Sequence, residues 1–430
     1  MTTVLDSPAP SDRHPVRMVV RDDLERSRLT VFFRLLLGIP HYIWLSFWTL
    51  GAILAAVANW FATLALGKSP DLLHNFLSAY VRYVTHVSAY LFLAGNPFPG
   101  FAGDPGSYPI DVEIDPPAAQ NRWITGFRLF LALPAVLLAS VLIGGASAGR
   151  GNGYQAGGVA ATIAFLAWFA CLVRGRMPLG FRDALAYALR YSAQVDAYLF
   201  LLTDRYPDSD PVLPRPTAPT PRPAVRLELT DDLRRSRLTV FFRGLLALPH
   251  LVWLVLWGVA AFFAAIANWL VTVVRARPSD PLWRFLSAYL RYWAHVNAFL
   301  YLVTNLFPGF TGTPGSYPLD LEYDPPERQS RWTAGFRLLL AVPALLVAGA
   351  LGGGLLLAGV FGWFFALATS RMPRGLRNLG AYAIRYSAET YAYVLVLSGR
   401  YPFSGPNLAE AGQASVGPGA EPSSGVFTEG

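Results

Sequence analysis

Charged residues and cysteines are scarce in this chain of 430 residues. Asp, Glu, Lys and Arg make up only 14% of it, whereas 53% is hydrophobic, and this balance excludes an intrinsically disordered chain and disfavours an ordinary cytosolic enzyme. The net charge of +8 is too small for a dedicated nucleic-acid-binding protein, so we expect no nucleic-acid partner. The single cysteine, Cys171, excludes an intrachain disulfide and a cysteine-based zinc site.

The N-terminal residues lack the pattern of a secretory signal peptide, which combines a basic stretch, a short apolar core and a small-residue cleavage site. Residues 1–14 are polar, and the first apolar stretch starts near Leu29. We expect 1–14 to be a disordered tail and the first membrane segment to direct insertion.

Internal repeats organise the sequence. The nonapeptide Arg26–Arg34 recurs letter for letter at Arg235–Arg243, and later matches have an offset shorter by 14 residues because of a glycine-rich excess at 144–158. Each half is itself double, since a Phe-Arg pair with a proline six residues after the arginine occurs four times. These pairs are Phe33-Arg34, Phe127-Arg128, Phe242-Arg243 and Phe336-Arg337. A tryptophan also precedes an arginine by 22 residues four times, at Trp60/Arg82, Trp168/Arg190, Trp269/Arg291 and Trp363/Arg385.

The repeats predict two membrane domains of two units each. The first domain covers 15–207, with units at about 15–107 and 108–207, and the second covers 224–402, with units at about 224–316 and 317–402. Residues 208–223 read as a proline-rich linker and 403–430 as a disordered tail.

The apolar stretch of each unit is too long for one straight membrane span. No charged residue lies between Arg34 and Lys68, and a helix of that length measures about 50 Å against about 30 Å of hydrocarbon. Gly51, Gly258 and the insertion at 144–158 lie near the middle of these stretches. We therefore expect a helical hairpin in every unit, with shallow re-entrant penetration as an alternative.

A second helix follows each apolar stretch. In the first unit its polar residues Asn75, Ser78, Arg82 and His86 form a narrow stripe at helical spacing. This pattern is typical of an amphipathic helix at the membrane interface, or of a third span whose stripe faces inward.

Short alternating segments predict strands. Acidic segments at 110–115 and 319–324 can pair with arginine-bearing segments at 16–19 and 225–229 through cross-strand charge matching. Because lysine and arginine crowd at the bases of the hairpins, the termini, strands and linker are expected to be cytoplasmic. If the second helix instead spans the membrane, the units alternate in orientation and the acidic strands are expected outside. The predicted fold is a mainly α integral membrane protein of four hairpin-plus-interfacial-helix units with a small cytoplasmic sheet.

The unit pattern resembles a known family. Phe-Arg, the later proline, the tryptophan, the Arg-aromatic pair and the closing Arg205-Tyr206-Pro207 or Arg400-Tyr401-Pro402 are similar to the bacterial membrane proteins of domain-of-unknown-function family 4389. The resemblance covers 15–207 and 224–402. It implies a location in the cell membrane and no established activity. Units one and three depart from it, because they end in Pro97-Phe98-Pro99 and Leu306-Phe307-Pro308.

Two arginines per unit are the candidate functional residues. A guanidinium group suits phosphate recognition, and basic pockets between membrane segments can hold anionic lipid headgroups. The alternative is a role in anchoring the topology and pairing with the acidic strands. The candidate headgroup ligands are Arg34, Arg82, Arg128, Arg190, Arg243, Arg291, Arg337 and Arg385.

Catalytic and metal sites receive less support. Ser147 lies in a G-x-S-x-G match within the insertion, but no predicted strand precedes it. The polar residue four positions after each Arg82-type arginine changes from His86 to Gln194, His295 and Glu389, which favours structural hydrogen bonds over shared chemistry. The carboxylates Asp111, Glu113, Asp115, Asp320, Glu322 and Asp324 are expected to pair with arginines and not to bind a metal.

We conclude from the sequence that the chain is a multi-pass cell-membrane protein without a cofactor. Its expected role is that of a non-catalytic, lipid-contacting or scaffold module, and its expected partners are membrane lipids, in particular anionic ones. A transporter built from duplicated halves is the alternative, and a lipid-modifying enzyme that uses Ser147 comes third.

Overall fold

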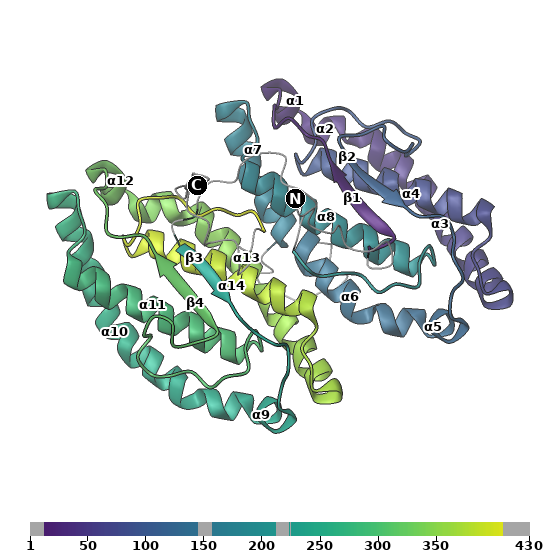
Figure 1. Ribbon diagram of the computed structural model, residues 1–430. Coiled ribbons are helices and arrows are strands. Elements are labelled where there is room, and N and C mark those ends of the chain that lie inside the picture. Colours follow the sequence, from purple (N-terminus) through teal and green to yellow (C-terminus); the bar gives the residue numbers. More distant parts are fainter. Residues whose placement is uncertain (1–12, 145–156, 212–222, 224, 407–430) are drawn as a thin grey trace, which may run out of the picture.

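The computed structural model describes residues 13–144, 157–211, 223 and 225–406. Within these ranges the chain is mainly helical, and the four sequence repeats fold into four similar units. The first half of the chain (units 1 and 2) and the second half (units 3 and 4) lie side by side (Figure 1).

Each unit contains a strand, a short helix, a long apolar helix and a second helix. The strands are β1 (Val16–Val20), β2 (Ile110–Ile114), β3 (Val225–Leu229) and β4 (Leu319–Tyr323). The short helices are α1 (Arg28–Phe32), α5 (Arg122–Gly126), α9 (Arg237–Phe241) and α12 (Arg331–Gly335). The long helices are α2 (Arg34–Leu37) with α3 (Ile39–Leu66), α6 (Arg128–Ile143) with α7 (Val159–Arg174), α10 (Arg243–Arg275) and α13 (Arg337–Thr369). The second helices are α4 (Asp71–Leu91), α8 (Leu179–Leu199), α11 (Asp280–Leu300) and α14 (Arg374–Val394).

The predicted strand pairing is confirmed, and it forms two separate two-stranded sheets where one sheet was expected. β1 pairs antiparallel with β2, and β3 pairs antiparallel with β4, so each half has its own sheet. Arg17 lies opposite Glu113 and Arg226 lies opposite Glu322 in these registers. The charge matching across the strands therefore favours pairing a strand of an odd unit with a strand of an even unit.

The prediction of helical hairpins is wrong. α10 and α13 are unbroken helices of 33 residues each, and α3 runs for 28 residues through Gly51 without a turn. Glycine in a helix interior costs about 1 kcal/mol relative to alanine, and this cost is too small to force a turn in a stretch that packs along its whole length. The break in each unit falls at the phenylalanine of the Phe-Arg pair, which caps the short helix in a non-helical conformation.

Unit 2 follows the same plan despite its insertion. Arg128 at the start of α6 contacts the C-terminal end of α8, whereas α7 ends at Arg174, five residues before α8 begins. The two outer ends of α6 and α7 therefore lie at opposite ends of α8, which a hairpin does not allow. A Cβ atom added to Gly158 would lie 2.4 Å from the Cα atom of Gly144. The start of α7 therefore lies directly beside the end of α6.

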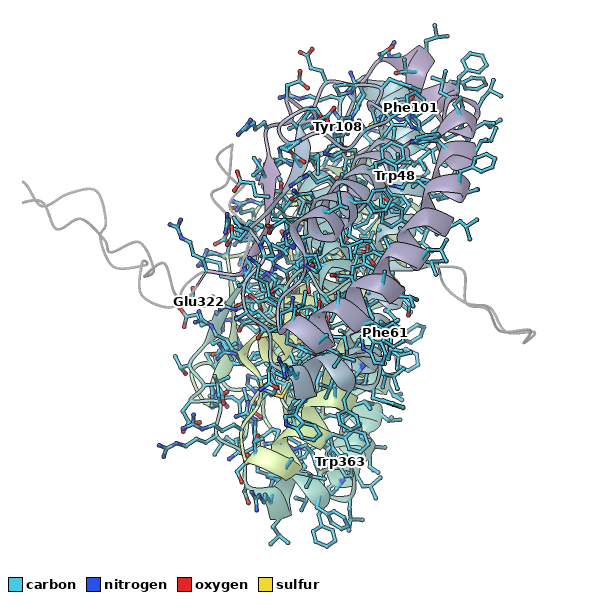
Figure 2. All side chains as sticks on the ribbon, turned by 90° about the vertical axis from the view of Figure 1, so that its right-hand side faces the viewer. Trp48, Phe61, Phe101, Tyr108, Glu322 and Trp363 are labelled. Carbon is cyan, nitrogen blue, oxygen red and sulfur yellow. The ribbon has the colours of Figure 1, made fainter. Side chains whose placement is uncertain are left out.

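The molecule has three layers. In Figure 2, Phe61 of α3 lies towards one side of the molecule and Glu322 of β4 lies at the opposite edge. The second helices lie between, because they contact both the long helices and the strands. The second helices are therefore covered by the long helices on one side and by the strands on the other, and their position relative to a membrane stays a prediction. At the centre, the rings of Tyr187 in α8 and Tyr382 in α14 meet edge to face and join the two halves.

Candidate functional site

The outward sides of the long helices expose large hydrophobic side chains, and we call this surface the apolar face. Leu54 is 65% exposed, Phe130 is 79% exposed and Phe263 is 65% exposed. Scattered apolar residues are normal on a soluble protein, but a large contiguous set marks an interaction surface. Further members are Leu35, Leu36, Phe47, Leu50, Phe61, Phe165, Val255, Leu256, Phe262, Leu338, Leu339 and Phe364.

Three of the long helices are long and apolar enough to cross a membrane. They are Arg34–Leu66, Arg243–Arg275 and Arg337–Thr369, with mean hydropathies of 1.7, 2.1 and 2.2. Length and composition therefore agree with a membrane protein.

Exposed basic residues lie at or near the ends of the long helices, and we call them the basic rim. Arg28 donates to the carbonyl oxygen of Val173, and Arg122 donates to that of Ala65, so each closes the C-terminal turn of the neighbouring unit's long helix. The other members are Lys68, Arg174, Arg176, Arg237, Arg275, Arg277, Arg331 and Arg371. Trp123 and Trp332, both 78% exposed, lie next to rim arginines in the sequence.

Four of the eight candidate arginines hold the C-terminal end of their own unit's second helix. Arg34 donates to the carbonyl oxygens of Gly95 and Asn96, and its guanidinium lies 4.1 Å from the centre of the Tyr90 ring. Arg128 likewise donates to Tyr198 and Thr203 over the Tyr198 ring. Arg243 and Arg337 repeat the arrangement in the second half. A cation is stabilised there because the last carbonyls of a helix have no partners within the helix.

The other four candidate arginines join the second helix to the segment packed over it. Arg82 and Arg291 donate to the strand carbonyls of Val112 and Leu321. Arg190 donates to the carbonyl of Asp210, and Arg385 donates to that of Gly405. Their contacts differ from those of the first set, so the structure does not assemble the eight arginines into one site.

The burial of the candidate arginines determines whether they are accessible to a lipid headgroup. All of the candidate arginines except Arg82 are buried, with at most 9% of their surface exposed. Burial lowers the pKa of Arg128, although the nearby Tyr198 and Asp204 oppose this shift. Headgroup binding by these eight residues stays a prediction, whereas the exposed cations next to the apolar face belong to the basic rim.

The repeat pattern did not reveal the hydrogen-bond partners of the repeated tryptophans. Trp60 in unit 1 donates its indole N–H to the carbonyl oxygen of Thr125 in unit 2, and Trp168 in unit 2 donates to Val31 in unit 1. Trp269 and Trp363 make the same reciprocal contacts between units 3 and 4. The signal was the recurrence of an indole N–H in an apolar helix, because a half-buried indole requires an acceptor.

The acidic strand residues bind protein groups. Asp111 accepts from the ring nitrogen of His86 at 2.7 Å and from the backbone N–H groups of Gly106 and Val112. Burial tends to raise the pKa of Asp111, but these hydrogen bonds outweigh burial and lower it. Asp115 pairs with Arg17 at 2.8 Å, which confirms the predicted pairing. The described residues contain no group of three or more His, Cys, Asp or Glu side chains that could hold a metal. Ser147 lies outside the described residues.

The chain was compared with known proteins and families. Neither the search of curated proteins nor the search of solved structures gave a match. The family described as "Domain of unknown function (DUF4389)" matches four times, at residues 28–102, 154–209, 237–311 and 331–404. These matches cover more than half of the chain and fall one in each structural unit. The chain therefore belongs to the DUF4389 family, as a fourfold arrangement of its domain.

Proposed function

We propose that the protein is a non-catalytic membrane scaffold whose apolar face is embedded in one leaflet while its sheets face the water. The observation that carries this proposal is the layering, because the exposed apolar side chains of the long helices and the exposed acidic side chains of the strands, such as Glu322, lie on opposite sides of the molecule (Figure 2). Each large apolar side chain moved from water into lipid contributes about 1.5–3 kcal/mol.

The second helices and the strands run along the length of the long helices, and this arrangement favours long helices that lie in the plane of the membrane. Along α3, His41 bonds to Tyr83, Trp48 stacks on Tyr83, and Asn59 bonds to the carbonyl of Phe200, so the second layer follows the long helix along its length. The strands in turn follow the second layer. If α3 stood upright in the bilayer, the charged strand residues would enter the hydrocarbon beside it, at a cost of several kcal/mol each.

The basic rim supports the same placement and a preference for anionic lipids. Cations around an apolar surface lie at the level of the headgroups, where each adds about 1 kcal/mol of attraction to an anionic membrane. Exposed tryptophans such as Trp123 and Trp332 are also typical of the membrane interface. The transporter alternative relied on interrupted spans, and α10 and α13 run without interruption.

A depth series along α3 tests the orientation. Single cysteines replace Leu36, Phe47, Leu54 and Phe61, which are exposed along one side of the α2–α3 helix, in a Cys171→Ala background, and carry spin labels in vesicles that contain anionic lipid. These positions span about 37 Å. We expect similar depths at all four positions, measured by the ratio of oxygen to nickel-chelate accessibility.

The control is Glu322→Cys on the opposite face, where the label should be accessible to the water-soluble nickel chelate. A depth that is greatest in the middle of α3 and shallow at both ends would instead establish a membrane-spanning helix. Labels that reach no hydrocarbon at any position would contradict membrane attachment altogether.

A further inference from the structure

A groove of about 630 Å³ lies between the two halves. Phe130, Leu131 and Pro134 of α6 form one wall, and Phe361 and Phe365 of α13 form the other. Phe130 and Phe365 also belong to the exposed side of the long helices, so the groove is continuous with the apolar face. Its walls therefore suit a hydrocarbon chain.

Polar groups gather in the segment that follows α8. Asp204, Tyr206, Asp208 and Ser209 of this segment line the groove. The described residues that line it include two carboxylates and no lysine, arginine or histidine. This composition contrasts with the basic rim at the helix ends. The acidic part of the groove therefore attracts a cationic group and disfavours an isolated anion.

The second half holds the equivalent segment in the same way but with a different side chain. The backbone N–H of Asp208 donates to Gln194, and that of Phe403 donates to Glu389, at the matching position of unit 4. Tyr187 and Tyr382 donate to the carbonyls of the serines that follow, Ser209 and Ser404. The backbone at 208 thus accommodates phenylalanine, and the carboxylate is particular to the groove.

We propose that this groove binds one aminophospholipid, with an acyl chain between α6 and α13 and its primary ammonium group at Asp204 and Asp208. A cation for the phosphate of the same lipid is Arg374, which lies between the lining residues Pro373 and Gly375 and remains 71% exposed although its Nε atom lies 3.7 Å from the carboxylate of Asp210. The inference rests on the proposed function for the supply of lipid from the membrane. It goes beyond that function because it assigns a specific lipid headgroup, a primary ammonium, to a specific site, the groove between α6 and α13.

The test uses the full chain and phosphatidylethanolamine that carries a photoactivatable group near the end of one acyl chain. We expect crosslinks to the peptides that contain Phe130 and Phe365. Unlabelled phosphatidylethanolamine should compete for them, and phosphatidylcholine should compete far less, because its trimethylated nitrogen has no N–H to donate to a carboxylate. Asp208→Asn should lower this labelling roughly tenfold, as expected for one charge-assisted hydrogen bond, and Asp208→Phe should lower it at least as much.

The matched control is Phe403→Asp, which makes the reverse change in the other half and should leave the labelling of the groove peptides unchanged. Labelling in detergent micelles separates this proposal from membrane attachment, since it requires no vesicle binding. Crosslinks spread over the apolar face, competition by both lipids alike, or unchanged labelling of Asp208→Asn would each overturn the groove assignment and leave the scaffold proposal standing.

Discussion

Buried arginines are the residues that most distinguish this fold. Arg34, Arg128, Arg243 and Arg337 have at most 2% of their surface exposed, and each closes the end of a second helix. The helix ends they hold are strained, because Leu93, Leu201, Leu302 and Val396 adopt positive φ angles between 59° and 66°. Left-handed conformations are uncommon for such side chains, so the arginine contacts offset a local cost in every unit.

Replacing Arg337 tests the structural role of this set. Arg337→Met leaves the carbonyl of Ser398 and the side chain of Gln329 without their charged donor. We expect the free energy of unfolding to fall by about 1.5–3 kcal/mol, measured by denaturant unfolding in a fixed lipid mimetic. Arg331→Met, at an exposed position of the same unit, should change it by less than about 0.5 kcal/mol. Equal losses in the two variants would contradict the assigned role.

Glu389 makes stability depend on pH. Burial raises the pKa of Glu389 above its ordinary value of 4.5, and Arg385 and the N–H of Phe403 only partly oppose this shift. Above pH 4.5 the folded protein therefore retains a proton that the unfolded chain has released. The free energy of unfolding should fall as the pH rises from 4.5 to the raised pKa, and then level off.

Glu389→Gln is the matched variant, because Gln194 occupies the position in unit 2 that Glu389 occupies in unit 4. Because burial also raises the pKa of Asp196, to about 7, Glu389→Gln should make this part of the pH profile less steep when unfolding is followed between pH 4.5 and 8. A profile that keeps the same slope in the variant would show that another group is responsible.

At the scale of elements, the strands were predictable and the form of the long helices was not. Arg17 and the acidic residues of 110–115 indicated a pairing that the structure confirms, because opposite charges across a strand pair are a local pattern in the sequence. The hairpin prediction instead compared helix length with bilayer thickness. That comparison applies only to a helix that stands upright in the bilayer. It does not apply to a helix that lies in the plane of the membrane, which is the orientation proposed above.

Contacts between units were the part of the site that the sequence did not reveal. The four indole N–H groups bond to carbonyls about 65 or more residues away in the chain, and no local pattern identifies such an acceptor. The repeat did show that the arginines and tryptophans mattered in every unit. It did not show that the arginines are buried, because long cationic side chains are usually exposed.

At the scale of the whole molecule, the two sheets should lie on one side of the membrane. Both carry exposed acidic residues, Glu113 in the first half and Glu322 in the second. In intact expressing cells, Glu113→Cys and Glu322→Cys in a Cys171→Ala background should both resist a membrane-impermeant maleimide. Both should react after the cells are opened, because the strands are expected to be cytoplasmic. Labelling of one position and protection of the other would show that the halves have opposite orientations.

The reciprocal tryptophan contacts set a minimum size for a self-sufficient chain. Each unit donates an indole N–H to a carbonyl of its neighbour and accepts one in return. In a single unit, the indole N–H would lack its acceptor and the carbonyl would lack its donor. Two units complete the exchange, and two pairs then meet at Tyr187 and Tyr382. A relative with one unit would have to form homodimers to satisfy the same groups. A relative with two units would be complete in itself and would have the surface on which a second copy can assemble.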